Sequence, residues 1–428
     1  MSGSLSWARL GRRGYGVFWV IGGQAAQSLT SFLTGLVLGR CVSQEALGAY
    51  ALGLSFCFLI ISLGDTLIAT PYTYLRASGE GEPHALFSSA LWGSAALGLV
   101  VALLLTLLHQ FGAGLPSELW PALPLAVMGL VMREFLRRHF YVINRSRQAL
   151  VLDLTSAVGQ LAALGVLAWA GWLSAEAVFF AIAGVCALSF ALSLPQAQAS
   201  FFWPPLRQLA TQWRAFLAYG GWLVAGGLCH VASVQLYPWL ALLGGGQAMA
   251  GLYAACIAVT NLINPLLIAL TNHFRPRFIA HYQEAGRARL LPYMLLRALP
   301  FLLPALGFVL LAWLAGEPLL GLLYGPDFSK GGPALVYLAF GLLAVAAAAP
   351  IQLGLLALRA PVSNLFYHGT NLTVLVVMAL IWHDRLSLEL LAQFYCGANV
   401  AGLLMLATMF LVMAKKTNRC TGEIQASD

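Results

Sequence analysis

Residues 85–108 have the sequence ALFSSALWGSAALGLVVALLLTLL, a run of 24 residues without a charged side chain. The hydrocarbon core of a bilayer is about 30 Å thick and a helix rises 1.5 Å per residue, so about 20 apolar residues cross it. Inside lipid the backbone polar groups must be satisfied within the segment, which favours a helix. The run therefore predicts a membrane-spanning helix.

Eleven further segments have the same length and apolar character. Hydrophobic residues make up 60% of the 428 residues and charged residues 9%, against roughly one quarter charged in soluble domains. This composition excludes a soluble globular protein and predicts an all-α, polytopic membrane protein with about 12 transmembrane helices. The other predicted spans are Tyr15–Leu38, Gly48–Leu75, Leu119–Val142, Ala149–Trp172, Ala175–Leu194, Phe216–Leu243, Met249–Phe274, Leu291–Leu314, Ala334–Leu356, Val362–Trp382 and Leu388–Met413.

The lysines and arginines gather in alternate loops. With a cytoplasmic N-terminus, 20 of the 23 fall at cytoplasmic ends, and only Arg40, Lys330 and Arg385 at the opposite ends. Because positive charge resists translocation, this bias predicts that both termini are cytoplasmic. The same bias accounts for the net charge of +8, so nucleic acid is not an expected partner.

The chain is predicted to form two six-helix bundles. Proline and polar residues interrupt the hydrophobic rhythm at its midpoint, PQAQASFFWPPLRQLATQW. The predicted parts are an N-terminal lobe, 1–194, a cytoplasmic linker, 195–213, a C-terminal lobe, 214–414, and a cytoplasmic tail, 415–428. The motifs GAY (48–50) and GLY (251–253) open equivalent spans and indicate an internal repeat. Six is even, so both lobes enter the membrane in one orientation, related by a pseudo-twofold axis along the membrane normal.

Short motifs at the helix ends resemble a known family. Residues 38–40 (LGR) and 43–50 (SQEALGAY) are similar to the first hairpin of Wzx-type polysaccharide exporters, and residues 251–253 (GLY) and 323–328 (LYGPDF) resemble their second half. That family comprises flippases for lipid-linked O-antigen and exopolysaccharide repeat units, in the superfamily that also holds multidrug exporters and the lipid II flippase. The resemblance covers nearly the whole chain and implies two bundles around a central cavity.

The resemblance also implies a location in the bacterial inner membrane, a substrate and partners. The substrate would be an oligosaccharide linked to polyprenyl pyrophosphate. The partners would be membrane lipids, a polysaccharide polymerase and the chain-length machinery, with no cofactor.

Polar residues follow one face of several predicted spans. Gln24 and Gln27 belong to such a stripe in the first span, and Asn261 and Asn264 to one in the eighth. Polar side chains are costly against lipid, so a stripe faces protein or water. Interhelical hydrogen bonds explain one stripe, whereas several favour a hydrated cavity, where these four residues would bind substrate. Further stripes are Ser55, Ser62, Asp65, Thr66 and Thr73 in the second span and Asn364, Tyr367, His368 and Asn371 in the eleventh.

Charged residues deep in the predicted spans are candidates for function. Asp65 is near the membrane midplane, where an ionised carboxylate costs at least ~2.5 kcal/mol, so it should face a cavity, pair or bind a proton. We expect Asp65 to have a coupling or gating role, with a structural bond between helices as the alternative. Arg133 and Arg137 share a face of the fourth span, where a guanidinium suits a pyrophosphate or an acidic sugar. The alternative for Arg137 and the neighbouring Arg138 is that their side chains extend to lipid headgroups, and Arg138 is interpreted as an interfacial anchor.

Three further residues lie within spans. Arg297, in the ninth span, is a third predicted basic contact for the substrate. His230, in the seventh, is a gating candidate because a histidine can titrate near neutral pH, and a histidine that packs and hydrogen-bonds in the bundle is the alternative. Asp153 is near the start of the fifth span, where a carboxylate favours the positive helix end, and is interpreted as structural.

The leading hypothesis is a flippase that works by alternating access between the two lobes. The alternative is a multidrug or cation antiporter of the same superfamily. Drug exporters often carry an acid in the first helix, whereas this chain carries Gln24 and Gln27 there, which lowers that alternative.

An enzyme is the third class of hypothesis, and the sequence disfavours it. A sugar polymerase or ligase typically has a large outer loop, and the outer loops here are short. The residues before Asp65 are Ser-Leu-Gly, without the Gly-x-Gly-Asp pattern of aspartyl intramembrane proteases, and no His-Glu-x-x-His or Gly-x-Ser-x-Gly motif occurs. The seven cysteines have no disulfide or metal spacing. We therefore expect no catalytic residue and no metal site.

Overall fold

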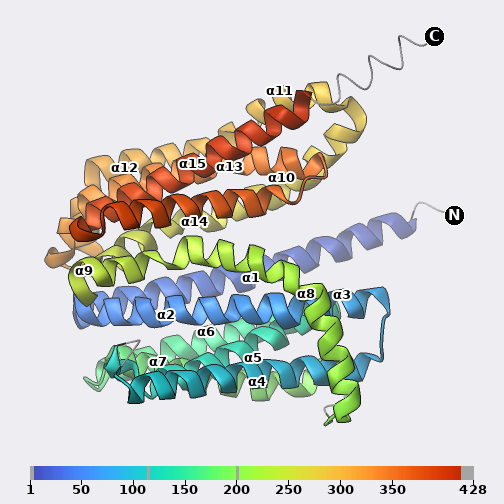
Figure 1. The fold of residues 1–428 in the computed structure, drawn as a ribbon, viewed down its shortest axis with the longest axis horizontal. Coiled ribbons are helices and arrows are strands. Elements are labelled where there is room, and N and C mark those ends of the chain that lie inside the picture. The colour runs from blue at the N-terminus through green and yellow to red at the C-terminus, as the bar shows by residue number, and fades with distance from the viewer. Residues whose placement is uncertain (1–3, 113–115, 199–201, 416–428) are drawn as a thin grey trace. The chain divides into compact units, whose positions relative to one another are not determined.

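A computed structural model of the chain describes residues 4–112, 116–198 and 202–415 (Figure 1). Within these ranges the chain is helical, without a β-strand. Packing divides it into two compact units, residues 1–231 and 232–428, and each is described by itself. The all-α fold class predicted from the sequence is confirmed.

The first unit is a bundle of long helices joined by short turns. Its helices are α1 Ser4–Cys41, α2 Gln44–Gly64, α3 Thr70–Ser78, α4 Pro83–Gln110, α5 Ala122–Val142, α6 Ser146–Trp169 and α7 Ala175–Ser193. The short turns are the π-helical η1 Asp65–Ala69 and the 3-10 turns η2 Ser117–Leu119 and η3 Leu194–Ala197. Helix α8, Leu206–Gln235, begins in this unit and ends in the second.

The second unit has the same all-helical construction. Its helices are α9 Tyr237–Thr260, α10 Asn264–Ala285, α11 Leu290–Leu296, α12 Leu299–Tyr324, α13 Gly332–Ala357, α14 Ser363–Ile381 and α15 Leu388–Lys415. Its 3-10 turns are η4 Asn261–Ile263, η5 Arg287–Arg289, η6 Pro326–Gly331 and η7 His383–Arg385. The predicted cytoplasmic tail lies outside the described residues, apart from Lys415 at the end of α15.

Side chains that cap the backbone define the starts of several helices. Ser43 accepts a hydrogen bond from the backbone N–H of Ala46 at the start of α2 (3.2 Å). At the start of α7, Ser174 accepts in the same way from Ala177 (3.1 Å). Such caps satisfy N–H groups that have no partner within the helix, so the sequence itself sets where these helices begin.

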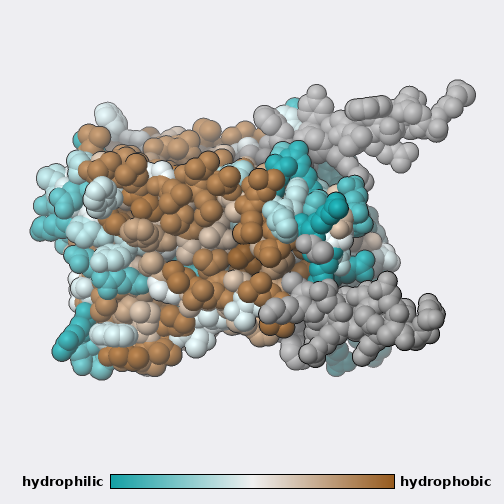
Figure 2. Space-filling model, turned by 90° about the horizontal axis from the view of Figure 1, so that it is seen from above, coloured by the Kyte–Doolittle hydropathy of each residue, from teal (hydrophilic) through white to brown (hydrophobic). Residues whose placement is uncertain are grey.

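Nine helical segments of the described residues are long and apolar enough to cross a membrane, some holding more than one predicted span. On the face drawn in Figure 2, hydrophobic residues form a broad band, and hydrophilic residues gather at its two ends. Helix α4 shows the same character along one stripe, where Leu99, Leu103 and Leu107 are each more than half exposed. A long stripe of exposed leucines is favourable against lipid, and together with the nine described apolar segments it makes the chain a multi-pass membrane protein.

Two predicted spans are interrupted. The turn η1 breaks the second predicted span just before Pro71, and Arg297 lies in a break between α11 and α12, just before Pro300. Proline lacks the N–H that continues the helical ladder, so the backbone adjusts in the preceding turn. Helix α8 begins at Leu206, so residues 206–213 of the predicted linker are helical.

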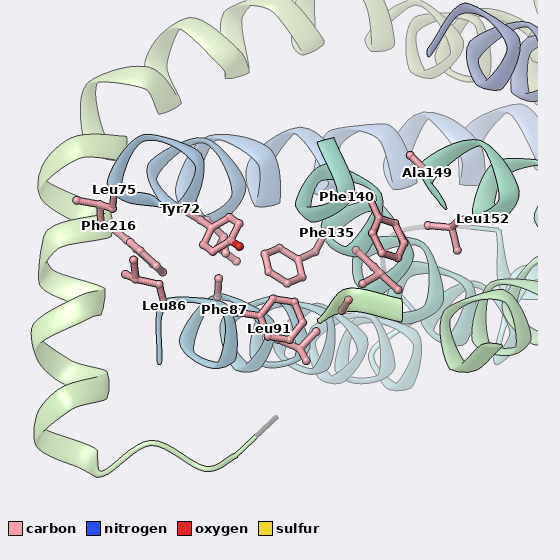
Figure 3. Packing of buried hydrophobic residues seen from close by; sticks show 14 residues of the cluster. Tyr72, Leu75, Leu86, Phe87, Leu91, Phe135, Phe140, Ala149, Leu152 and Phe216 are labelled. Atoms are coloured by element: carbon pink, nitrogen blue, oxygen red, sulfur yellow. The ribbon is translucent and has the colours of Figure 1, made fainter. Parts of the chain in front are cut away.

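A cluster of buried apolar side chains holds the first unit together near the functional candidates (Figure 3). The ring of Phe135 on α5 packs 5.5 Å from that of Tyr72 and 5.8 Å from that of Phe87, measured between centroids. Phe216 of α8 is fully buried in the same cluster. Between helices in lipid, close packing of this kind replaces the hydrophobic effect as the source of stability. The cluster fixes α5 and therefore the charged residues that α5 carries.

Candidate functional site

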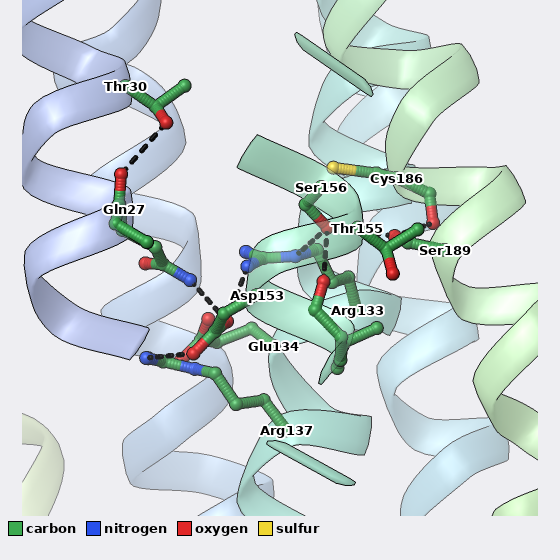
Figure 4. Close-up of polar contacts among 12 residues, drawn as sticks. Gln27, Thr30, Arg133, Glu134, Arg137, Asp153, Thr155, Ser156, Cys186 and Ser189 are labelled. Atoms are coloured by element: carbon green, nitrogen blue, oxygen red, sulfur yellow. Dashed lines mark hydrogen bonds and ion pairs between the residues drawn. The ribbon is translucent and has the colours of Figure 1, made fainter. Parts of the chain in front are cut away.

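Helix α5 carries four charged residues within about two turns, Arg133, Glu134, Arg137 and Arg138. Figure 4 shows the first three of them with their contacts. Residues three or four positions apart lie on one helix face, so Arg133 and Arg137 project in the same direction. That face meets α6 and α1, whereas Arg138 points toward η1. All three arginines have acidic partners within the first unit.

Arg133 forms a buried ion pair with Asp153 of α6. Its Nη2 donates to Asp153 Oδ1 at 2.6 Å, and its Nε donates to the Ser156 hydroxyl at 2.8 Å. Arg133 is 5% exposed and Asp153 is fully buried. Desolvating two ions costs several kcal/mol each, and this cost is offset only with good geometry and extra hydrogen bonds, both of which this pair has.

Gln27 of α1 completes the shell around Asp153. Its Nε2 donates to Asp153 Oδ1 at 2.6 Å, so α1, α5 and α6 meet at this carboxylate. Gly23, one turn earlier on α1, allows the approach, because a Cβ there would lie 2.4 Å from Asp153 Oδ2. At Gly22 a Cβ would meet only Leu150 Cδ1, at 3.5 Å. The absent side chain of Gly23 is therefore a requirement of the buried ion pair.

Arg137 and Glu134 form a second, less buried pair on α5 itself. Arg137 Nη2 donates to Glu134 Oε1, and Arg137 Nη1 lies 3.9 Å from Asp153 Oδ2. The side chains of Arg137 and Glu134 are 18% and 19% exposed. Asp153 Oδ2 has no hydrogen-bond partner among the described residues, so the long contact with Arg137 is its main electrostatic support.

Asp65 and Arg138 form the third pair. Arg138 Nη2 donates to Asp65 Oδ1, and the two side chains are 42% and 32% exposed, Arg138 being the more open. Asp65 begins the π-helical turn η1, and Thr70 lies 3.5 Å from its Oδ2. Beside the pair, Asp65 and Glu134 line a cavity of about 10 Å³, enough for one water molecule. The pair therefore joins the turn η1, at the end of α2, to α5 next to a small cavity.

The charges of this region balance. Three guanidinium groups face three carboxylates in the first unit. The pairs are Arg133–Asp153, Arg137–Glu134 and Arg138–Asp65. Exposure increases from the first pair to the third, so the network extends from a desolvated end at Asp153 to an accessible end at Arg138. An incoming anion could exchange partners with Arg138 at much lower cost than with Arg133.

The other predicted site residues lie apart from this network. Gln24 is exposed on α1, and His230 is exposed on α8. Asn264 Nδ2 donates to Asn261 Oδ1 at 2.9 Å, at the break between α9 and α10. Arg297 is exposed, with its guanidinium carbon 5.4 Å from the centre of the Tyr293 ring. Their predicted contacts with substrate stay predictions.

Most polar residues of the stripe in the eleventh predicted span make hydrogen bonds between helices of the second unit. The Tyr367 hydroxyl of α14 donates to Asn399 Oδ1 of α15 at 3.0 Å, and the Asn371 amide is 3.2 Å from the same oxygen. His368 Nδ1 lies 3.3 Å from the Ser233 hydroxyl. For Tyr367 and Asn371, the interhelical hydrogen bonds that were the alternative interpretation are present.

The sequence interpretation identified Arg133 and Asp65 but paired neither with its partner. One signal for the first pair was available. Helices α5 and α6 form an antiparallel hairpin with a short turn, and Arg133 and Asp153 are equally far from residue 143 at that turn. Residues equally far from a hairpin turn lie at similar depth, so opposite charges at such positions predict an ion pair. Among the described residues, no group of three or more His, Cys, Asp or Glu side chains could hold a metal ion.

Known proteins resemble this chain in fold rather than in sequence. No protein-family model and no curated protein matches the sequence. A multidrug resistance MATE family transporter of the MOP superfamily, inward-facing, matches with a TM-score of 0.74 at 15% identity, over 91% of this chain and 96% of that chain. The lipid II flippase MurJ, in an inward closed conformation, matches with a TM-score of 0.72 at 13% identity, over 96% of this chain and 93% of that chain.

A third match has a different description. A MOP superfamily transporter from Pyrococcus furiosus, whose binding pocket is described as having reversed polarity, matches with a TM-score of 0.61 at 15% identity, over 93% of this chain and 95% of that chain. At such identities the likeness shows the fold. Over the part of the chain that the structure describes, the fold is that of these transporters, the two-lobe, twelve-helix fold predicted from the sequence.

Proposed function

We propose that the protein is a flippase that moves a lipid-linked oligosaccharide across the bacterial cytoplasmic membrane by alternating access. The observation that carries the proposal is the likeness in fold to a lipid II flippase over nearly the full length of both chains. The arginines of α5 support an anionic substrate, because a guanidinium binds a pyrophosphate through two parallel hydrogen bonds. The proposed role is transport, without an enzymatic step.

Arg138 and Arg137 are the proposed points of entry for the pyrophosphate. Both are more exposed than Arg133, and each already binds a carboxylate that an anionic oxygen can replace. Arg133 is predicted to act with them, and its burial supports a positioning role in which it holds Asp153 beside Arg137. Among the other predicted substrate contacts, Arg297 would add a basic group, and the polar residues would bind sugars. Those polar residues are Gln24, Gln27, Asn261 and Asn264.

Asp65 is the proposed coupling residue. When a pyrophosphate binds Arg138, Asp65 loses its ion-pair partner and becomes free to bind a proton or a cation. It sits at the start of η1, so a change in its charge acts where α2 is already irregular. His230 remains a second gating proposal, because imidazole is the side chain whose ordinary pKa lies nearest to physiological pH.

A multidrug or cation antiporter is the second candidate, and the likeness to the MATE transporter supports it. An antiporter of cations needs an acid that is free to exchange them. In the described part of the first unit, the three acids of this network, Asp65, Glu134 and Asp153, each have an arginine partner. The described part of α1 supplies Gln24 and Gln27 instead of an acid. This arrangement favours the flippase.

The cellular setting follows from the same proposal. Both termini would be cytoplasmic, as the distribution of arginine and lysine predicts. A polysaccharide polymerase and the chain-length machinery would use the translocated O-antigen or exopolysaccharide units on the other side of the membrane.

Reconstitution tests the proposed function. Liposomes containing the purified protein and a fluorescent polyprenyl-pyrophosphate oligosaccharide are treated with a glycosidase that does not cross the membrane. Translocation exposes lipid from the inner leaflet, so more sugar is cleaved than in protein-free liposomes. Arg138→Gln should slow this process, whereas Arg385→Gln, which removes a charge at the predicted opposite face, is the matched control. Uptake of a cationic dye without translocation of the lipid would establish the antiporter instead.

A further inference from the structure

The start of α8 lies across the first unit instead of along it. In Figure 1, this part of α8 runs across the ends of its neighbours before the helix turns to follow them. Figure 3 shows Phe216 on this part of α8, with Leu75 and Leu86 next to it. We call residues 206–218 the crossing segment. Because Leu75 and Leu86 flank the loop between α3 and α4, the crossing segment lies at the predicted cytoplasmic end of the bundle.

One face of the crossing segment packs tightly on α4. The Ser89 hydroxyl donates a hydrogen bond to Gln212 Oε1. Trp213 lies so close to Gly93 that a Cβ there would be 2.0 Å from its ring. With the buried Phe216, these positions follow helical spacing and form a single inner face. The crossing segment is therefore held to the first unit by this face.

The outer face carries two arginines. Arg207, Thr211 and Arg214 recur at intervals of three or four residues, and all are exposed, followed by Leu217 at 50% exposure. The ion pairs of the described residues include neither arginine. Arg207 is in the first turn of α8, where the helix dipole disfavours a cation, so helix stability does not explain its charge. The outer face is therefore basic and open to an anionic partner.

Aromatic residues adjoin this basic face. Trp203, just before the crossing segment, is 61% exposed and packs edge-on against Trp92 of α4, with 4.3 Å between ring centroids. The Trp92 Nε1 donates to the backbone carbonyl of Phe202 at 3.3 Å, which holds this segment against α4. Tryptophan gathers at membrane interfaces because its ring is apolar and its N–H is polar. Arginines on a short helical segment with an exposed tryptophan beside it suit the membrane interface, where cations meet headgroups and an indole ring meets the acyl boundary.

We propose that the crossing segment, through Arg207, Arg214 and the adjoining Trp203, binds anionic phospholipid headgroups of the cytoplasmic leaflet. The arginine forks donate to phosphate oxygens, and the tryptophan ring enters the boundary between headgroups and acyl chains. The crossing segment leads directly into the rest of α8, and residues from Val224 onward belong to a segment long and apolar enough to cross a membrane. This position places the outer face at the level of the headgroups in the proposal. This inference is independent of the transported substrate.

Hydrogen exchange of the full-length protein in nanodiscs tests the proposal. One set of nanodiscs contains phosphatidylcholine alone, and the other contains phosphatidylcholine mixed with phosphatidylglycerol. The amides of the crossing segment should exchange more slowly with phosphatidylglycerol, by about fivefold for each arginine that contacts the anionic surface. At high salt this difference should shrink, because the screening length falls to about 3 Å at 1 M.

Two double variants make the test specific. Arg207→Gln with Arg214→Gln should remove the difference between the two lipid compositions. Lys330→Gln with Arg385→Gln removes the same charge from the predicted opposite face and should retain the difference. Equal exchange in both lipids for the native protein, or an undiminished difference in the Arg207 and Arg214 variant, would overturn the proposal. Both variants change exposed side chains, and an unchanged elution volume on size exclusion verifies that they fold.

Discussion

Removing one partner of the Arg133–Asp153 pair should destabilise the protein far more than removing both. Arg133→Met leaves the Asp153 carboxylate fully buried without its ion-pair partner at 2.6 Å, and Asp153→Asn leaves the guanidinium in the same state. An uncompensated buried charge costs about 3–5 kcal/mol. The double variant removes both charges and retains the amide contact with Gln27, so its loss should stay within about 1 kcal/mol.

The size of the loss in unfolding free energy distinguishes the effect of an unpaired charge from that of lost hydrogen bonds. Arg133 makes hydrogen bonds to Asp153 and to Ser156, and a hydrogen bond between membrane helices contributes about 0.6 kcal/mol on average. Two such bonds account for about 1.2 kcal/mol, well below the loss expected for a desolvated, unpaired charge. The coupling free energy from the double-mutant cycle should therefore exceed about 2 kcal/mol.

Unfolding in mixed micelles of a mild detergent and sodium dodecyl sulfate, followed by tryptophan fluorescence, measures these differences. The matched control is the same cycle on Arg138→Met and Asp65→Asn, a pair whose side chains are 42% and 32% exposed. This pair should give a coupling free energy of about 1 kcal/mol or less. Single variants at Arg133 and Asp153 that lose no more than the control variants would refute the reasoning, as would a double variant that loses the sum of the two.

Three further predictions follow from neighbouring contacts. Gly23→Ala places a methyl group 2.4 Å from the buried carboxylate oxygen and should cost about 1–3 kcal/mol in the same unfolding assay, while alanine at the preceding glycine should be tolerated. Asp65→Arg and Arg138→Asp should each impair lipid translocation in liposomes, and the combined swap should restore part of it if the pair couples α2 to α5. A swap no better than the single variants would contradict that role. Glu82 caps α4 by accepting hydrogen bonds from the backbone N–H of His84 and the next residue, which lowers the pKa of its carboxyl. The stabilisation of α4 by the Glu82 carboxylate should be complete above the unfolded pKa of about 4.3 and lost as pH falls through the lower folded pKa. Hydrogen exchange in the first turn of α4 should therefore be slower in the native protein than in the Glu82→Gln variant above these pKa values, and equal in the two below them.

The predicted spans and their order were available from the sequence for a local physical reason. Whether a segment such as 85–108 enters the bilayer depends on its own length and apolar surface, which composition states directly. Every predicted span overlaps a helix of the structure, and the end of α2 was obscured only because η1 and Pro71 follow it. Residues 206–213 of the crossing segment were predicted as part of a linker, because the two prolines just before them hide the start of a helix whose inner face depends on α4.

In the candidate site, the sequence indicated which charged residues lie deep in the spans, and the tertiary structure was needed to identify their partners. The depth of Arg133 and of Asp65 is a local property, and both were identified from the sequence as unusual. Their partners were not, because an ion pair depends on which faces of two helices meet, and apolar residues around those faces permit many rotations of a helix in lipid.

By itself, the sequence determined that this chain crosses the membrane many times as helices and that some charges lie deep within them. Only the tertiary structure decided that Arg133, Arg137 and Arg138 each have an acidic partner, with exposure rising from Asp153 to Arg138. The physical reason is that the cost of a buried charge is set by the atoms within a few ångströms of it. Helix packing supplies those atoms from α1, α2, α5 and α6.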